Sequence, residues 1–185
     1  MGDSQAVQAL VVVDLQSAFV GGPGAVPDAP TLVATVDGLV RSARERAALV
    51  VHLQNDGPPG AVDEPGTPGW ELSRPVGEHE VVVRKSTDDG FHDTELASLL
   101  TGGGVQRIAV CGVLSEMCVS ATARTALALG YGVVLPHDAH ATYDIPAVDG
   151  LADLVPHTMV SRVAEWALGD AVEIVARAAD VHFAA

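Results

Sequence analysis

The stretch that decides the fold runs from Val105 to Leu129 and reads VQRIAVCGVLSEMCVSATARTALAL. Its first part, Val105–Val113, is apolar and rich in β-branched residues, which predicts a buried parallel strand. Its second part, Ser115–Leu129, has the composition of a helix with Ser115 as its N-cap. A strand that passes directly into a helix is the unit from which parallel α/β sheets are built.

The same alternation continues on both sides of this stretch. Further strands are predicted at Gln8–Leu15, Ala48–Gln54, Glu80–Arg84, Gly132–Leu135 and Ala171–Val175, and further helices at Thr31–Arg46, Thr94–Leu100 and Pro156–Leu168. Continuous apolar strands between helices indicate a parallel sheet covered on both faces. We therefore predict an α/β fold, a three-layer, doubly wound α/β/α sandwich with a six-stranded sheet, formed by a single domain over residues 1–185. The Gly- and Pro-rich segment Asn55–Pro75 is expected to be a long loop, either a lid or an interface arm.

The composition argues against several classes of partner. The 185 residues carry a formal net charge of −14 at pH 7, which opposes binding to nucleic acids and to anionic membrane surfaces. No apolar run approaches the roughly 20 residues that span a bilayer, and the N-terminal sequence lacks the basic segment of a signal peptide. The two cysteines, Cys111 and Cys118, are poorly spaced for a disulfide and suit a reducing cytoplasm.

Cys118 lies in the first turn of the predicted helix, directly after a strand. Free backbone N–H groups and the helix dipole favour an anion there, so we expect a lowered pKa and a more nucleophilic thiol. Ligand sites in open α/β sheets also lie at the carboxyl ends of the strands. The alternative is a small buried apolar residue, the commoner fate of a free cysteine.

Two further polar groups stand at the ends of predicted strands. Asp14 ends the first strand, and Lys85 directly follows the third. In the strand order 3-2-1-4-5-6 the first and fourth strands are neighbours, so Asp14 and Cys118 would share one crevice. Lys85 joins them only if its strand lies near the same centre. The alternatives are a helix cap or surface carboxylate for Asp14 and a solvated side chain for Lys85.

Three blocks around these residues carry a family resemblance. VVVDLQSAF (11–19), VVRKSTDDGFHDTEL (82–96) and CGVLSEMCVSATARTALALGYGVVLPHDAHAT (111–142) resemble the signature blocks of the isochorismatase-like cysteine hydrolases. That superfamily includes nicotinamidases and N-carbamoylsarcosine amidohydrolase. The similarity extends over roughly residues 9–175, and it implies the same three-layer fold and a catalytic triad of Asp14, Lys85 and Cys118.

The resemblance also implies covalent hydrolysis. Asp14 would be the general base toward Cys118, Lys85 would keep Asp14 ionised and stabilise the thiolate, and water would cleave a thioester. The oxyanion would be held by the backbone N–H groups of Leu114 and Cys118, with a cis peptide bond between Val113 and Leu114. An apolar plug is the alternative role for Leu114.

The chain departs from the nicotinamidases in its histidines. Where those enzymes carry an Asp-x-His pair after the second strand, this chain has HLQNDGP (52–58), in which Asn55 and Gly57 supply no such ligand. We therefore predict no catalytic zinc and no cofactor. The remaining histidines are interpreted as scattered and without a metal-ligand spacing, with His92 and His140 as candidates to line the pocket; they are His79, His92, His137, His140, His157 and His182.

Candidate substrate contacts are Gln16 and four aromatic side chains on loops beyond strand ends, namely Phe19, Trp70, Phe91 and Tyr143. Core packing is the alternative for each aromatic residue, and a capping or solvated role is the alternative for Gln16. Trp166 belongs to an apolar helical stripe and is expected in the core or in a subunit interface.

The resemblance favours a hydrolase that cleaves an amide or lactam C–N bond of a small molecule. Streptothricin hydrolases of actinobacteria belong to the same superfamily and open a lactam in a cationic antibiotic, which suits an acidic protein. One alternative is isochorismatase-type hydrolysis of an enol ether, although that reaction needs no cysteine nucleophile. The other is a non-catalytic binding domain with a relict site. The resemblance further implies a homodimer or homotetramer.

Overall fold

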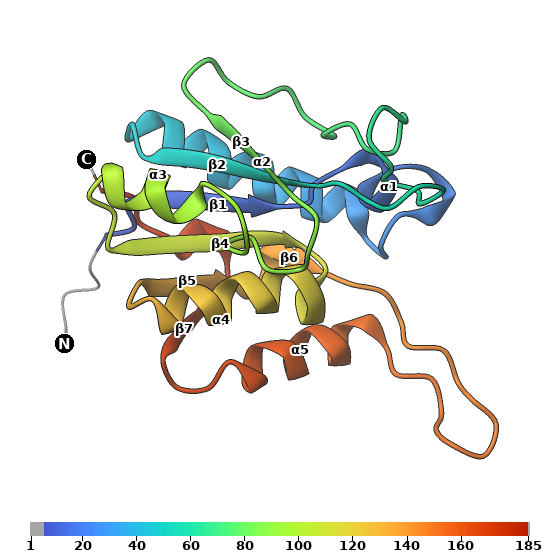
Figure 1. Ribbon diagram of the computed structural model, residues 1–185. Helices are drawn as coiled ribbons and strands as arrows, with labels where there is room; N and C mark the ends of the chain where they lie inside the picture. Colours follow the sequence, from blue (N-terminus) through green and yellow to red (C-terminus); the bar gives the residue numbers. More distant parts are fainter. Residues whose placement is uncertain (1–5, 185) are drawn as a thin grey trace.

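A parallel sheet forms the centre of the molecule (Figure 1). In the computed structural model, which describes residues 6–184, its strands follow the order β3-β2-β1-β4-β5-β7. The short strand β6 pairs with the end of β4. It was not predicted, because a strand of two residues has no recognisable sequence pattern. The strands are β1 (Ala9–Val13), β2 (Leu49–Asn55), β3 (Val81–Lys85), β4 (Arg107–Val113), β5 (Gly132–Pro136), β6 (His140–Ala141) and β7 (Val172–Val175).

Helices cover both faces of this sheet, which confirms the predicted three-layer α/β/α fold. One face is covered by α2 (Ala29–Glu45), and the other by α3 (Leu96–Gly102) and α4 (Ser120–Ala128), with α5 (His157–Ala167) beside α4 (Figure 1). The shorter helical segments are α1 (Ser17–Val20) and the turns Gly22–Gly24, Ser115–Val119, His137–Ala139 and Ala178–Asp180. Within residues 6–184, no helix combines the length and the hydropathy needed to cross a membrane.

The central strand β1 shows how the two faces are filled. All of its residues are buried. Leu10 and Val12 pack into the apolar cluster under α2, whereas Ala9, Val11 and Val13 pack into the cluster under α3 and α4. Successive side chains of a strand point to opposite faces, so a strand covered on both sides is apolar throughout. Each fully buried valine or leucine contributes roughly 1.5–3 kcal/mol.

The predicted helix Ser115–Leu129 is interrupted near its start. Residues Ser115–Val119 form a π turn in which Met117 has φ −105° and ψ −105°, and the regular helix α4 begins only at Ser120. Cys118 therefore lies in a distorted turn ahead of α4, and not in the first turn of a long helix.

Gly112 brings the carboxyl ends of β4 and β1 together. Its φ of +117° favours glycine, and a Cβ atom there would lie 2.0 Å from the carbonyl oxygen of Val13, its partner in the sheet. The peptide bond between Val113 and Leu114 is cis. It is the bond at which the family resemblance implies a cis peptide. The chain thus turns sharply at the end of β4.

The long loop after β2 folds back over the carboxyl edge of the sheet. Ser17 N–H donates to the carbonyl oxygen of Glu71 (2.8 Å), and Ala18 N–H donates to that of Gly69 (2.9 Å). Ser73 N–H donates to the carbonyl oxygen of Leu15 (2.9 Å). These bonds attach the loop to α1 and to the segment that follows β1.

Candidate active site

The three side chains of the predicted triad meet at the carboxyl edge of the sheet. Asp14 directly follows β1, Lys85 ends β3, and Cys118 lies in the turn after β4. The Lys85 Nζ atom lies 2.7 Å from Asp14 Oδ2 and 3.4 Å from Cys118 Sγ. The lysine therefore bridges the carboxylate and the thiol.

Lys85 reaches this centre from an edge strand. It lies opposite Asn55 in the register of β3 and β2, and β1 is one strand further on. Because neighbouring strands are about 4.8 Å apart, its side chain must cross the end of β2 to contact Asp14. On the way its ammonium donates to Asn55 Oδ1 (3.3 Å) and to the carbonyl oxygen of Thr87 (3.1 Å). Lys85 thus joins the cluster through the length of its side chain, although β3 is an edge strand and a position near the centre was expected to be necessary.

Asp14 is held in an unusual conformation that points its carboxylate inward. It is 2% exposed, has a φ of +48°, and donates its backbone N–H to the carbonyl oxygen of Leu53 (3.0 Å). Its Oδ2 atom accepts from Lys85, whereas Oδ1 is buried and has no hydrogen-bond partner within residues 6–184. A buried acceptor without a partner is costly, so Oδ1 is well suited to receive a proton.

Burial and charge act on all three groups. Burial raises the pKa of Asp14, and the nearby Lys85 offsets this only in part. Burial opposes the charge of Lys85, but Asp14 and Cys118 outweigh it and raise the pKa of the lysine. The pKa of the Cys118 thiol is raised by burial and by the negative charge of Asp14, which together outweigh Lys85. The predicted lowering of the pKa of this thiol is therefore wrong.

The raised pKa of the Cys118 thiol follows from the charge balance of Asp14, Lys85 and Cys118. One buried ammonium compensates one negative charge, and in the resting state Asp14 supplies that charge. Loss of the thiol proton to solvent would leave a second, uncompensated buried anion. Transfer of the same proton to Asp14 keeps the net charge at zero, so the arrangement is able to form a thiolate by internal proton transfer.

Asn55 and two aspartates complete the surroundings and are absent from the sequence prediction. Asn55 Nδ2 donates to Asp63 Oδ2 (2.6 Å), and Asp88 Oδ1 lies 3.6 Å from Cys118 Sγ. Asn55 ends β2, between the strands that carry Asp14 and Lys85, and that position is a usable signal. Asp63 and Asp88 stand on loops, where no periodic pattern fixes their position.

Two of the predicted substrate contacts instead anchor the long loop. Gln16 is fully buried, and its amide nitrogen donates to the carbonyl oxygens of Asn55 (3.0 Å) and Trp70 (2.9 Å). Its amide oxygen accepts from Asn55 N–H (2.8 Å), so no donor remains for a ligand. The Trp70 indole donates to Asp56 Oδ1 (2.8 Å), and the guanidinium of Arg84 lies 5.1 Å from its ring centroid.

The other aromatic residues separate into two groups. Phe19 and Tyr143 are half-buried against the cluster under α2, and Tyr143 Oη donates to the carbonyl oxygen of Gly24 (2.7 Å). The Phe91 ring stacks on Tyr131 at a centroid distance of 6.1 Å. Since Tyr131 directly precedes β5, it marks the amino edge of the sheet. The Phe91 ring thus packs toward that edge, and a contact between Phe91 and a substrate stays a prediction.

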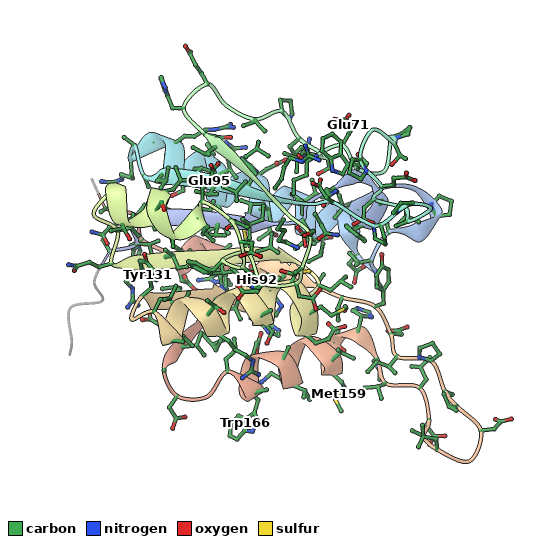
Figure 2. All side chains as sticks on the ribbon, viewed as in Figure 1. Glu71, His92, Glu95, Tyr131, Met159 and Trp166 are labelled. Carbon is green, nitrogen blue, oxygen red and sulfur yellow. The ribbon has the colours of Figure 1, made fainter. Side chains whose placement is uncertain are left out.

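Trp166 lies on the outer face of α5 and is not a core residue. Its exposed fraction is 78%, and Met159 projects from the same helix (Figure 2). Val163, which is also exposed, lies at helical spacing between them. The expectation of a core position is wrong, whereas a subunit interface stays a prediction.

The fold and this cluster together define an α/β protein whose polar site lies at the carboxyl ends of its central strands. The isochorismatase domain family matches residues 8–163 of the chain. The chain therefore belongs to the isochorismatase family, as the sequence blocks predict.

Two relatives are streptothricin hydrolases of Streptomyces noursei. The chain is 66% identical to the first over 181 residues, which cover 97% of this chain and 72% of that protein. It is also 66% identical to the second, of which it spans 66%.

Solved structures share the fold. An isochorismatase from Pseudomonas putida KT2440 superposes with a TM-score of 0.86 at 27% identity, covering 97% of this chain and 94% of the other. N-carbamoylsarcosine amidase from Thermoplasma acidophilum superposes with a TM-score of 0.70 at 28% identity, covering 75% and 86%.

Proposed function

We propose that this protein is a cysteine-dependent hydrolase that opens an amide or lactam bond, with streptothricin as its substrate. The observation that carries the proposal is the buried bridge of Lys85 between Asp14 and Cys118. The 66% identity to streptothricin hydrolase supports the substrate. The structural similarity to an N-carbamoylsarcosine amidase supports C–N bond chemistry.

The first half-reaction begins with proton transfer inside the cluster. Asp14 takes the thiol proton of Cys118 at Oδ1, the oxygen without another partner. The thiolate attacks the carbonyl carbon of the lactam, and Lys85 stabilises the sulfur anion as it forms. Asp14 then returns the proton to the lactam nitrogen as the C–N bond breaks. The products of this step are a thioester on Cys118 and a free amine.

The second half-reaction regenerates the thiol. Asp14 takes a proton from water, the hydroxide equivalent attacks the thioester carbon, and the C–S bond breaks. The sulfur anion then recovers the proton from Asp14. In both halves the backbone N–H groups of Leu114 and Cys118 are proposed to hold the oxyanion, because both residues belong to the turn after β4 that carries Cys118.

The charges around the thiol favour a cationic substrate. The charge of Lys85 is compensated by Asp14, whereas Asp88 lies 3.6 Å from Cys118 Sγ on the partly exposed side. The formal net charge of −14 acts in the same direction over longer distances. A ligand that carries ammonium groups is therefore attracted to the site.

The test compares the wild-type protein with Cys118→Ala on streptothricin, followed by liquid chromatography and mass spectrometry. We expect the wild type to add one water to the substrate and Cys118→Ala to be slower by at least about 10³-fold. Cys111→Ala is the matched control, because Cys111 is fully buried in β4, packs into the cluster under α2 and has no role in this scheme.

Other outcomes would point to different chemistry. Undiminished turnover by Cys118→Ala would refute the covalent mechanism. Pyruvate formation from isochorismate, with streptothricin left intact, would favour enol-ether hydrolysis. No turnover of streptothricin, N-carbamoylsarcosine or isochorismate would favour a relict site.

A further inference from the structure

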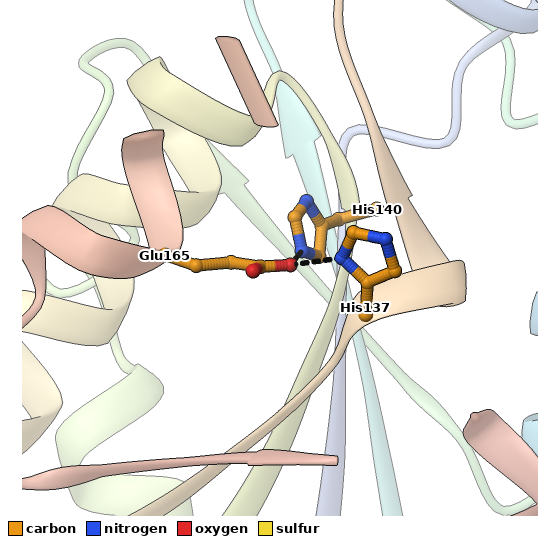
Figure 3. A group of neighbouring side chains, drawn as sticks. All are labelled: His137, His140 and Glu165. Atoms are coloured by element: carbon orange, nitrogen blue, oxygen red, sulfur yellow. Dashed lines mark hydrogen bonds and ion pairs between the residues drawn. The ribbon is translucent and has the colours of Figure 1, made fainter. Parts of the chain in front are cut away.

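A second group of titratable side chains lies between α5 and the connection from β5 to β6 (Figure 3). His137 belongs to the turn after β5, His140 begins β6, and Glu165 stands on α5. His137 Nδ1 lies 2.5 Å from Glu165 Oε1, and His140 Nε2 lies 3.1 Å from the same oxygen. The three side chains thus converge, with one ligand atom from each within 4.8 Å of the others.

We propose that His137, His140 and Glu165 form a structural binding site for a divalent transition metal, with Zn²⁺ as the preferred ion. Two imidazoles and a carboxylate are a common three-residue donor set for zinc, with water in the fourth position. Ligands at 2.0–2.2 Å from a tetrahedral ion are about 3.3 Å apart. The two contacts to Glu165 would lengthen by about 1 Å or less, and the ligand atoms, which now lie within 4.8 Å of one another, would all have to reach about this separation.

The groups around the cluster fit metal binding. His140 Nδ1 lies 2.8 Å from Ser115 Oγ, which in turn lies 3.0 Å from Ser161 Oγ. A hydroxyl either donates or accepts, so the pair of serines allows His140 to carry its proton on Nδ1 and to present the lone pair of Nε2. Metal-binding histidines are usually oriented by such a partner on the other ring nitrogen.

The Glu165 carboxylate would bind an ion through one of its two oxygens. Arg162 Nη1 donates to Glu165 Oε2 (3.1 Å), which leaves Oε1 facing the two histidines, where an ion would replace their hydrogen bonds to it. The side chains of Glu165 and His140 are 1% and 0% exposed. Buried charges are usually paired or coordinate metals, and this glutamate faces both imidazoles.

An ion has a path into the cluster. The His137 side chain is 51% exposed, and it borders a cavity of about 260 Å³ together with His140. Asp28 and Asp138 also line that cavity, so its charge attracts a cation, and its volume admits the water that completes the coordination. These histidines show no ligand spacing in the sequence because Glu165 lies 25 residues after His140.

The site would be separate from the proposed reaction. Its connection to the triad runs through Ser115, the first residue of the turn that carries Cys118. A bound ion would therefore fasten α5 to the β5–β6 connection and would support that turn from behind. Its expected effect is on stability, through preferential binding to the folded state.

The experiment uses the full chain after treatment with a chelator. Equilibrium dialysis with elemental analysis should find one Zn²⁺ per chain in the wild type, and Co²⁺ should give the visible absorption of a tetrahedral site. At a Zn²⁺ concentration of 100 times Kd, Tm should rise by about 5–10 °C. His137→Ala should lose the bound ion and the shift in Tm. His92→Ala is the matched control, because its ring is also exposed (60%) and lies outside the cluster.

Several results would overturn the proposal. One is that no Zn²⁺ binds to the wild type. Another is that His137→Ala binds as much Zn²⁺ as the wild type does. Loss of the ion in Cys118→Ala but not in His137→Ala would assign it to the triad instead. Circular dichroism without metal checks the fold of each variant, and Glu165→Gln replaces His137→Ala if the latter is unfolded.

Discussion

Replacement of Lys85 by methionine would measure the buried ion pair directly. Methionine has nearly the length of lysine and no charge, so the packing at the end of β3 is retained. The change removes the ammonium that lies 2.7 Å from Asp14 Oδ2 and 3.4 Å from Cys118 Sγ. Asp14, whose pKa burial already raises, then loses the cation that favours its ionised form.

The size of the effect follows from the geometry. Removal of one partner from a buried ion pair costs about 3–5 kcal/mol, and here the cost takes the form of a further rise in the pKa of Asp14. A carboxyl group whose pKa is higher in the folded state than in the unfolded state destabilises the protein as pH rises from the unfolded value toward the folded one. The stability lost in Lys85→Met should therefore be small near pH 4 and reach about 3–5 kcal/mol near pH 8.

Urea unfolding at both pH values provides the assay, with Asp14→Asn and the double variant completing a cycle. The double variant carries no buried charge at these positions. Its loss of unfolding free energy at pH 8 should therefore be smaller than the sum of the losses in the two single variants. Turnover of Lys85→Met should fall by at least about 10²-fold, because a protonated Asp14 cannot accept the thiol proton. A stability difference that does not change with pH, or single losses that simply add, would refute the reasoning.

Three further changes test other parts of the structure. Gly112→Ala should cost about 3 kcal/mol or more in denaturant unfolding, since its Cβ would lie 2.0 Å from a carbonyl oxygen of β1; Gly102→Ala, with nothing within 4 Å, is the control, and equal losses would contradict the argument. Burial opposes the charge of Glu80, but hydrogen bonds from Arg44 and other donors outweigh it and lower its pKa to about 2. The stability that ionised Glu80 contributes is therefore complete above pH 4.5 and is lost as pH falls toward 2. Glu80→Gln should make the loss of stability in acid less steep, and an unchanged loss would contradict this role of Glu80. Trp166→Glu should reduce self-association in light scattering if a second copy covers α5, and an unchanged mass would argue for another interface.

Most of the fold could be predicted because local patterns carry it, whereas the family resemblance was needed to bring Asp14, Lys85 and Cys118 together as a candidate triad. The apolar runs of β1, β2 and β4 mark strands that are buried on both faces, and parallel strands end at one edge of the sheet. Polar residues that end such runs therefore meet in space, as Asp14 and Cys118 do. Lys85 joins them through the length of its side chain, which strand order alone does not reveal.

The features that were missed depend on contacts between distant segments. The break of the helix at Met117 is set by the turn that follows the end of β4, and no residue type in SEMCV signals it. Gln16 holds the long loop through a hydrogen bond to the carbonyl oxygen of Trp70, and these two groups become neighbours only after folding. The pKa of Cys118 is governed by its burial beside Asp14, which outweighs any influence of the short turn.

The raised pKa of the Cys118 thiol has a consequence for the fate of the protein under oxidative stress. Peroxides and alkylating agents react with thiolates, and their rate follows the fraction of thiolate at ambient pH. A thiol that gives up its proton only to Asp14 exposes little thiolate at rest, so Cys118 should survive peroxide better than a cysteine of ordinary pKa. In the proposed mechanism, the same retention of the proton until Asp14 accepts it would keep the Cys118 thiol reduced between turnovers.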